Sequence, residues 1–172
     1  MKYCIKCGHQ LVKRSLKHEG MIPYCVHCEE YRFPYANTAV SIILLSPDQS
    51  QVLLIQQYQK KDYILVAGYV NQQESLEEAL YRECSEETGR KLLGIQYLKS
   101  AYYEASNTLM CCFIGVADSV SLKNISTWEI DKANWFSFTE ALQVIKPNSL
   151  AKHFLEAYLA YRKNNPLILI NG

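Results

Sequence analysis

Residues 68–89 read GYVNQQESLEEALYRECSEETG and hold an unusual density of acidic side chains. Two glycines, four glutamates and one arginine occur there in the spacing G-x5-E-x7-R-E-x2-E-E-x-G, at Gly68, Glu74, Arg82, Glu83, Glu86, Glu87 and Gly89. Ser75 and Glu78 form an S-x-x-E capping box, which opens helices. Because Gly89 suits a helix C-terminus, the spacing predicts one helix from Ser75 to Gly89.

The glutamates at the end of this helix indicate a bound cation. At about 100° per residue, Glu83, Glu86 and Glu87 share one arc of roughly 100°, close to the helix's apolar side chains. The carboxylates are therefore expected to continue the buried stripe, where like charges repel and tend to protonate. A divalent cation removes that difficulty. Carboxylate oxygens suit Mg²⁺ or Mn²⁺, with substrate phosphate oxygens completing the shell.

A solvated acidic helix with i,i+4 ion pairs is the ordinary alternative. Such a helix needs basic partners, and Arg82 is the only cation between Lys61 and Arg90. The spacing therefore favours a metal site that holds a phosphate chain.

The segment resembles the Nudix box, G-x5-E-x7-R-E-U-x-E-E-x-G-U, in which U is a bulky apolar residue. Its charged and glycine positions all match. Arg90 stands where the last U is expected, and Asn71-Gln72-Gln73 replaces the Pro-Gly often seen before the first glutamate.

The resemblance also implies a function for each residue of the motif. Glu83, Glu86 and Glu87 would bind the metal. Arg82 would orient the glutamates, and Glu74 would support the loop before the helix. Gly68 would border the bound nucleotide.

The rest of the chain after residue 34 has an α/β pattern. The expected strands cover 38–45, 52–57, 63–67 (leading into a Gly68 loop), 92–100, 108–117 and 133–138, with a hairpin turn at Pro47-Asp48. A short helix is expected after Thr139, and a longer one over Ser149–Lys163 with Leu150, Phe154, Ala157 and Tyr161 on one face. The resemblance implies an α/β/α sandwich with a mixed sheet over 35–172. The apolar tail Leu167–Ile170 is expected to cover either a sheet edge or a partner.

Four cysteines near the N-terminus predict a structural zinc site. Cys4 and Cys7, and then Cys25 and Cys28, form two C-x2-C pairs separated by seventeen residues, the spacing of a zinc ribbon. Residues 1–34 are too few to fold alone without such a staple. Disulfides are the alternative, but they need an oxidising compartment. His27, inside the second pair, is an alternative zinc ligand.

The remaining cysteines and the charge of the ribbon carry weaker signals. Cys84, Cys111 and Cys112 lie in apolar surroundings and are expected to be buried, inert thiols. Residues 1–34 hold six Lys or Arg against three Glu. That small excess leaves nucleic-acid binding open, but it favours a structural module docked on a neighbour.

Composition excludes several other classes of protein. Of 172 residues, 49% are hydrophobic and the formal net charge is +1, which gives no general attraction to nucleic acid or membrane. There is no run of 18 apolar residues and no apolar signal region, so a cytoplasmic location is expected.

Two further segments point to one branch of the family. A four-cysteine ribbon followed by residues 33–40, FPYANTAV, and residues 129–136, EIDKANWF, is similar to the NADH pyrophosphatase (NAD⁺ diphosphatase) branch of Nudix hydrolases. The resemblance makes Glu129 a further metal ligand or the general base, and it suggests a homodimer. A solvated acid before a strand is the alternative for Glu129.

The element that marks the substrate in that branch, S-Q-P-W-P-F-P-x-S, is altered here. Residues 100–108 read SAYYEASNT, so that Tyr103 stands at the tryptophan position and all three prolines are absent. Tyr103 can stack on adenine or nicotinamide. Equally, Tyr102 and Tyr103 can be ordinary core or strand aromatics.

These features predict a Mg²⁺- or Mn²⁺-dependent nucleotide diphosphatase. Metal ions would neutralise the diphosphate oxygens and activate a water, and Glu129 or Glu86 would accept its proton. NAD(H), yielding a mononucleotide and AMP, is the expected substrate. ADP-ribose or another dinucleotide is an alternative. A non-catalytic ligand sensor is another, although a sensor needs no complete set of metal ligands.

Overall fold

A computed structural model describes residues 1–123, 125–126 and 128–168. The chain forms two compact units, Met1–Ala36 and a second one that begins at Asn37. The first unit is a three-stranded antiparallel sheet in the order β1-β2-β3, with β1 Val12–Leu16, β2 Gly20–Cys25 and β3 Glu30–Tyr31.

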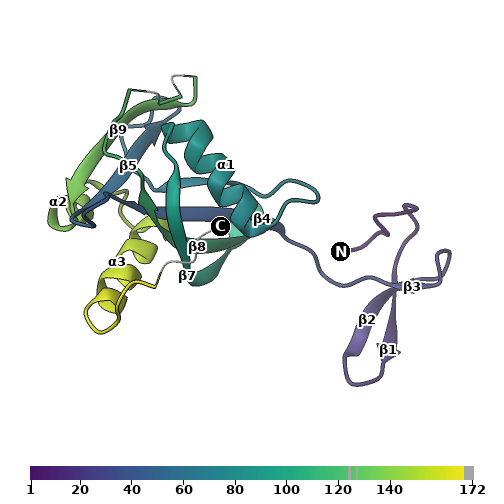
Figure 1. The fold of residues 1–172 in the computed structure, drawn as a ribbon. Coiled ribbons are helices and arrows are strands. Elements are labelled where there is room, and N and C mark those ends of the chain that lie inside the picture. The colour runs from purple at the N-terminus through teal and green to yellow at the C-terminus, as the bar shows by residue number, and fades with distance from the viewer. Residues whose placement is uncertain (124, 127, 169–172) are drawn as a thin grey trace. The chain divides into compact units, whose positions relative to one another are not determined.

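The second unit is built on a mixed six-stranded sheet (Figure 1). Its strands are β4 Asn37–Leu45, β5 Gln51–Gln57, β6 Val66–Tyr69, β7 Leu92–Tyr103, β8 Thr108–Ala117 and β9 Ile130–Ser137. They follow the order β7-β8-β4-β5-β9, and β6 pairs with β4. The β4–β8 pairing is parallel and the others are antiparallel, so the expected mixed sheet is confirmed.

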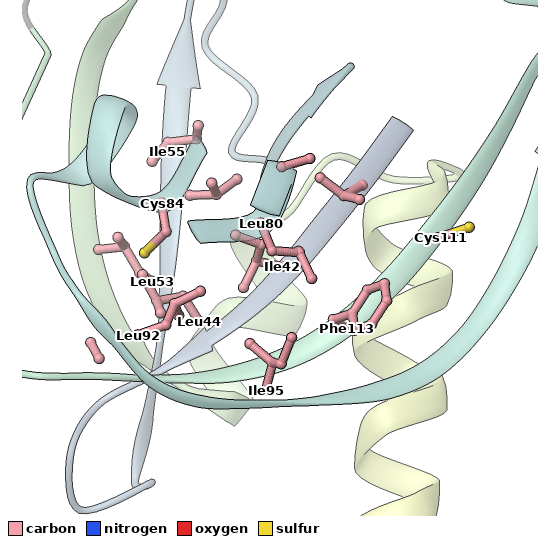
Figure 2. Close-up of a cluster of buried hydrophobic side chains, with 14 of the residues drawn as sticks. Ile42, Leu44, Leu53, Ile55, Leu80, Cys84, Leu92, Ile95, Cys111 and Phe113 are labelled. Atoms are coloured by element: carbon pink, nitrogen blue, oxygen red, sulfur yellow. The ribbon is translucent and has the colours of Figure 1, made fainter. Parts of the chain in front are cut away.

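Helices cover both faces of this sheet. The helices are α1 Leu76–Thr88, α2 Phe138–Val144 and α3 Leu150–Arg162. Strand β4 is buried on both sides, and its alternate side chains enter two separate cores. Ile42 and Leu44 pack with Leu80 and Cys84 of α1 (Figure 2), whereas Ile43 packs on the side of α2 and α3. The predicted α/β/α sandwich is confirmed.

Local predictions hold best where capping and turn residues fix the chain. Ser75 and Glu78 make the reciprocal capping box, and Gly89 ends α1 in the left-handed conformation with φ 64°. Strands β4 and β5 form the hairpin, with Leu45 opposite Val52. Along its other edge, β5 pairs with β9 from Gln51 to Gln57.

Several boundaries differ from expectation because sheet pairing extends the strands. Gly68 is not in a loop but lies inside β6, where it is paired with Val40. Strand β7 continues to Tyr103, so both tyrosines at its end are exposed strand residues. Strand β9 begins at Ile130, three residues earlier than expected, because it pairs with β5.

The C-terminal helix buries a slightly different face from the one predicted. Phe154 is buried as expected, but its buried neighbours are Leu155 and Tyr158, while Leu150 and Tyr161 pack at the border of the core. After α3, Leu167 packs against the same core and the Ile168 amide donates to the side chain of Gln96 on β7 at 2.9 Å. Residues 169 and 170 of the apolar tail lie outside the described residues.

The cysteines outside the ribbon are buried, as expected: Cys84, Cys111 and Cys112. Burial raises the pKa of the Cys84 thiol to about 11, which keeps it protonated and unreactive. Within the described ranges, every helix is too short or too polar to span a bilayer.

Candidate active site and zinc site

Arg82 is the centre of the acidic cluster on α1. Its Nε and Nη2 donate to the two carboxylate oxygens of Glu74, at 2.6 and 2.9 Å. Its Nη1 donates to Glu83 at 2.6 Å and to Glu86 at 3.1 Å. Nη2 also donates to the carbonyl of Tyr69 at 2.9 Å. One guanidinium therefore ties the start of α1, its last turns and β6 together.

Glu74 braces the loop that leads into the helix. Besides Arg82, it accepts a hydrogen bond from the amide of Asn71 at 2.7 Å. The Arg82 guanidinium and this amide hold the pKa of Glu74 at about 2. Glu74 therefore stays ionised and acts as a permanent anchor for Arg82, consistent with the support expected of it.

Gly68 makes room for the carboxylate of Glu83. A Cβ atom at this position would overlap the Glu83 carboxyl group, so no side chain fits there. Because Glu83 lies flat against the β6 backbone, burial raises its pKa, and the nearby Arg82 lowers it only in part. Gly68 is thus needed for the placement of an acid as well as for the border of the cavity.

Glu87 is the most buried acid of the cluster, only 1% exposed. Its Oε1 accepts from Nε2 of Gln57 at 2.7 Å, whereas its Oε2 has no hydrogen-bond partner. Burial, followed by repulsion from Glu83 and Glu129, raises the pKa of Glu87 to about 8. An unpaired buried carboxylate oxygen of this kind is suited to bind a cation.

Glu86 departs from the predicted helix face. Its side chain is 61% exposed, so the carboxylates do not all continue the buried stripe. Glu87 and Cys84 are buried, whereas Glu86 lies one step around the helix beside Arg82. Within the described residues, Glu83, Glu86 and Glu87 do not bring one oxygen each within 4.8 Å of one another.

A cavity of about 500 Å³ opens beside this cluster. Its walls join α1, β6, the end of β5 and the end of β7, and they include Gly68, Arg82, Glu83, Tyr103 and Glu129. Five of the residues singled out from the sequence therefore border one space. Glu86 and Glu87 are not wall residues, but Glu87 accepts a hydrogen bond from Gln57, which is one.

Two residues of this site carry no sequence signal of their own. Gln57 holds Glu87, and the hydroxyl of Tyr58 donates to Oε1 of Glu129 at 2.9 Å. Gln57 ends β5 and Tyr58 follows it, outside the box, and the pairing of β5 with β9 brings Tyr58 close to Glu129. A search for polar residues at the ends of core strands is the one pattern that could have found them.

The residues fit a hard divalent cation. The donors are carboxylate oxygens, one of them buried and unpaired, and the neighbouring cavity is bordered by Arg82, Glu83 and Glu129. Glu83, Glu86 and Glu87 would hold the ion, and Arg82 contacts the first two of them. Such an arrangement can bind a phosphate chain through the ion and polarise it.

The four ribbon cysteines converge as the spacing predicts. Cys7 and Cys25 place their Sγ atoms 3.5 Å apart, and Cys4 and Cys28 place theirs 3.9 Å apart. All four sulfurs lie within 4.8 Å of one another. Zinc–sulfur bonds of about 2.3 Å require sulfurs about 3.8 Å apart in a tetrahedron, so the set fits one Zn²⁺.

The alternative zinc ligand, His27, is not part of this four-sulfur group. Its ring stacks on His9 with centroids 4.2 Å apart and planes only 8° from parallel. The two histidines form a separate group with Cys7, in which one possible ligand atom of each residue lies within 4.8 Å of the others.

The first prediction concerns the ribbon. Purified protein should hold about one zinc per chain, and Cys7→Ser should lose it and loosen residues 1–34, because three thiolates cannot close the site. Zinc content and amide hydrogen exchange measure both effects. Cys84→Ser, which alters a buried thiol outside the ribbon, should keep the zinc. A Cys4–Cys28 disulfide in reduced protein would contradict the assignment.

The second prediction follows from the raised pKa of Glu87. Because the metal-free folded protein holds a proton that the unfolded chain releases at lower pH, its stability should fall as pH rises from about 4.5 toward about 8. Thermal unfolding of chelator-treated protein at stepped pH values measures this slope. Glu87→Gln should flatten it, and Glu77→Gln, an exposed residue of the same helix, should not. Equal slopes in all three proteins would contradict the burial of a protonated Glu87.

Comparison with known proteins gives one family and one fold. The domain model described as the NUDIX domain matches residues 36–158. The NAD-capped RNA hydrolase NudC of Escherichia coli O9:H4 (strain HS) is 29% identical over 161 residues, which is 92% of this chain and 60% of that protein. NudC of Shigella boydii serotype 18 matches to the same extent. The chain therefore spans about 60% of the length of these curated relatives.

Solved structures share the fold at lower identity. A NUDIX hydrolase from Nitrosomonas europaea has a TM-score of 0.65 and 18% identity, over 96% of this chain and 95% of its own. The NUDIX domain of Shewanella oneidensis NrtR, complexed with ADP ribose, has a TM-score of 0.61 and 19% identity, over 80% and 92%. Since the domain model spans well over half of the sequence, the chain belongs to the NUDIX family.

Proposed function

We propose that this NUDIX-family protein is a Mg²⁺- or Mn²⁺-dependent diphosphatase that cleaves a nucleoside diphosphate linked to another group. NAD(H), giving a mononucleotide and AMP, is the proposed substrate. The observation that carries the proposal is the buried, unpaired Oε2 of Glu87 behind the wall of a cavity that Arg82, Glu83 and Glu129 also border.

The chain's residues would act mainly by positioning. A divalent cation would neutralise the diphosphate oxygens and activate a water. Glu83, Glu86 and Glu87 would hold that ion, and Arg82, anchored by Glu74, would keep the carboxylates aimed. Glu129 borders the same cavity as Glu83 and would accept the proton of the attacking water; Glu86, which is exposed, is the second candidate.

A second cavity supports a substrate with a planar ring next to its diphosphate. This cavity of about 580 Å³ shares Ala67, Tyr103 and Met110 with the first, and its other walls are largely apolar, including Leu65 and Phe154. A ring suits such a wall, and Tyr103 stands where the two spaces meet. The NAD-capped RNA hydrolases that the chain resembles support NAD(H) as the source of that ring.

ADP-ribose remains a second candidate substrate. The similar NUDIX domain of Shewanella oneidensis NrtR was solved with ADP ribose, which contains the same diphosphate. A non-catalytic sensor is the third reading. The complete set of Glu83, Glu86 and Glu87 argues against it, because binding alone needs no full set of metal ligands.

The two compact units suggest two separate roles. We infer that residues 1–34 form a zinc-stapled structural module and that residues 35–172 form the hydrolase. The support is the separation of compact units near residue 36 and the converging sulfurs of the first unit.

A substrate panel tests the proposed function. NADH, NAD⁺ and ADP-ribose are incubated with the full chain in Mg²⁺ or Mn²⁺, and the products are identified. A mononucleotide with AMP, formed from NADH in the presence of metal and absent with chelator, is expected. If ADP-ribose is clearly preferred, the NAD(H) assignment fails and the general diphosphatase survives; if nothing is cleaved, the sensor reading replaces both.

The third prediction concerns the acids. Glu86→Gln and Glu87→Gln should each keep the fold and lower turnover by about a hundredfold or more, as loss of a metal-supporting carboxylate does. Glu77→Gln should change little, because that side chain is exposed and lies about 120° around the helix from Glu83. Steady-state kinetics and circular dichroism measure both points. Equal losses at positions 77 and 86 would show that the helix face is assigned wrongly.

The fourth prediction concerns Tyr103. Stacking on one ring contributes about 1–3 kcal/mol, so Tyr103→Ala should weaken NADH binding by about that amount. The effect should appear mainly in KM, because a ring far from the phosphorus binds ground state and transition state alike. Tyr102→Ala is the matched control, since Tyr102 is similarly exposed but lines neither cavity. Unchanged kinetics for Tyr103→Ala would remove this tyrosine from the site.

A further inference from the structure

The end of strand β5 is distorted where it meets the acids. Along β5 and β9, Gln56 lies opposite Lys132 but Gln57 lies opposite Ile130, so the register shifts and Asp131 is skipped. Tyr58 and Gln59 then adopt left-handed backbone conformations, with φ of 56° and 58°. A bulge of this kind re-aims the side chains next to it, and such bulges are frequent beside active sites.

Two identical, neighbouring side chains at this end of β5 have different partners, as successive strand residues point to opposite faces. Gln56 and Gln57 are both 9% exposed. Gln56 donates to the carbonyl of Lys61 and so braces the loop that follows β5. Gln57 instead donates to Oε1 of Glu87 at 2.7 Å, inside the protein.

Glu87 is held differently from the other acids of the helix. Arg82 contacts Glu74, Glu83 and Glu86, and no contact between Arg82 and Glu87 occurs among the described residues. The donor on Glu87 is a neutral amide, which fixes one oxygen without cancelling the carboxylate's charge. With Oε1 occupied by Gln57, Oε2 is the oxygen left without a partner.

We propose that Gln57 is a positioning residue for the divalent cation: it fixes the rotamer of Glu87 so that Oε2 alone is presented to the ion. This inference rests on the proposed metal dependence. A cationic side chain at position 57 would compete with the ion for Glu87, whereas an amide orients the ligand and leaves its charge available. Outer partners of metal ligands typically change metal affinity by about 10–100-fold when removed.

The test measures the affinity of the full chain for Mn²⁺ in the absence of substrate. Electron paramagnetic resonance reports the concentration of free Mn²⁺ during the titration. Gln57→Met keeps the length of the side chain and removes the donor, and it should weaken Mn²⁺ binding by about tenfold or more. Gln56→Met is the matched control, with the same chemistry and burial, and it should bind Mn²⁺ like the wild type. Gln57→Leu serves as a second variant, and thermal unfolding of the metal-free proteins establishes that each is folded.

A purely structural contribution of Gln57 would lower the unfolding temperature and leave Mn²⁺ affinity unchanged. That result, or an equal loss of affinity in Gln56→Met, overturns the inference. At saturating Mn²⁺ the turnover of Gln57→Met should recover most of its loss, because only the placement of a ligand has changed. If the wild-type chain binds no Mn²⁺, the proposed function itself fails. If the wild type and Gln57→Met bind Mn²⁺ equally tightly, only the role of Gln57 fails.

Discussion

The repulsion between carboxylates crowded on one helix is the constraint on which the site depends. Four glutamates within the box must coexist at the border of a dry core, and each is stabilised in its own way. Glu74 is neutralised by a two-point contact with Arg82, Glu83 and Glu86 share the remaining nitrogen of that guanidinium, and Glu87 is buried with a raised pKa. Glu74 therefore serves only to anchor Arg82, whereas Glu83, Glu86 and Glu87 remain available to an ion.

Local sequence rules recovered much of this arrangement. The capping box at Ser75, the left-handed Gly89 and the two C-x2-C pairs are short-range features, and their geometry follows from a few neighbouring residues. The nearly continuous apolar run of β4 is likewise typical of a strand buried on both faces. Such local features can be predicted without knowing which strands pair in the sheet.

Long-range pairing decided the features that the sequence did not predict. Gly68 is a strand residue because β6 pairs with β4, and the pairing of β5 with β9, which has its extra residue at Asp131, brings the end of β5 close to Glu129. Helical periodicity placed Glu86 with Glu83 and Glu87, but the depth of each side chain depends on the sheet beneath α1, which periodicity does not contain.

The parallel pairing of β4 with β8 also determines when the sheet of the second unit can close during synthesis. Asn37 pairs with Thr108 and Leu45 with Val116, so the segment between these strands contains the whole of α1. Contacts of such sequence separation form slowly, since loop closure must come first. A nascent chain that stops before Thr108 leaves this edge of β4 unpaired, and an unpaired apolar edge is a template for aggregation. Synthesis of β8 therefore allows the edge to be covered and the sheet to close around α1 in the same folding event.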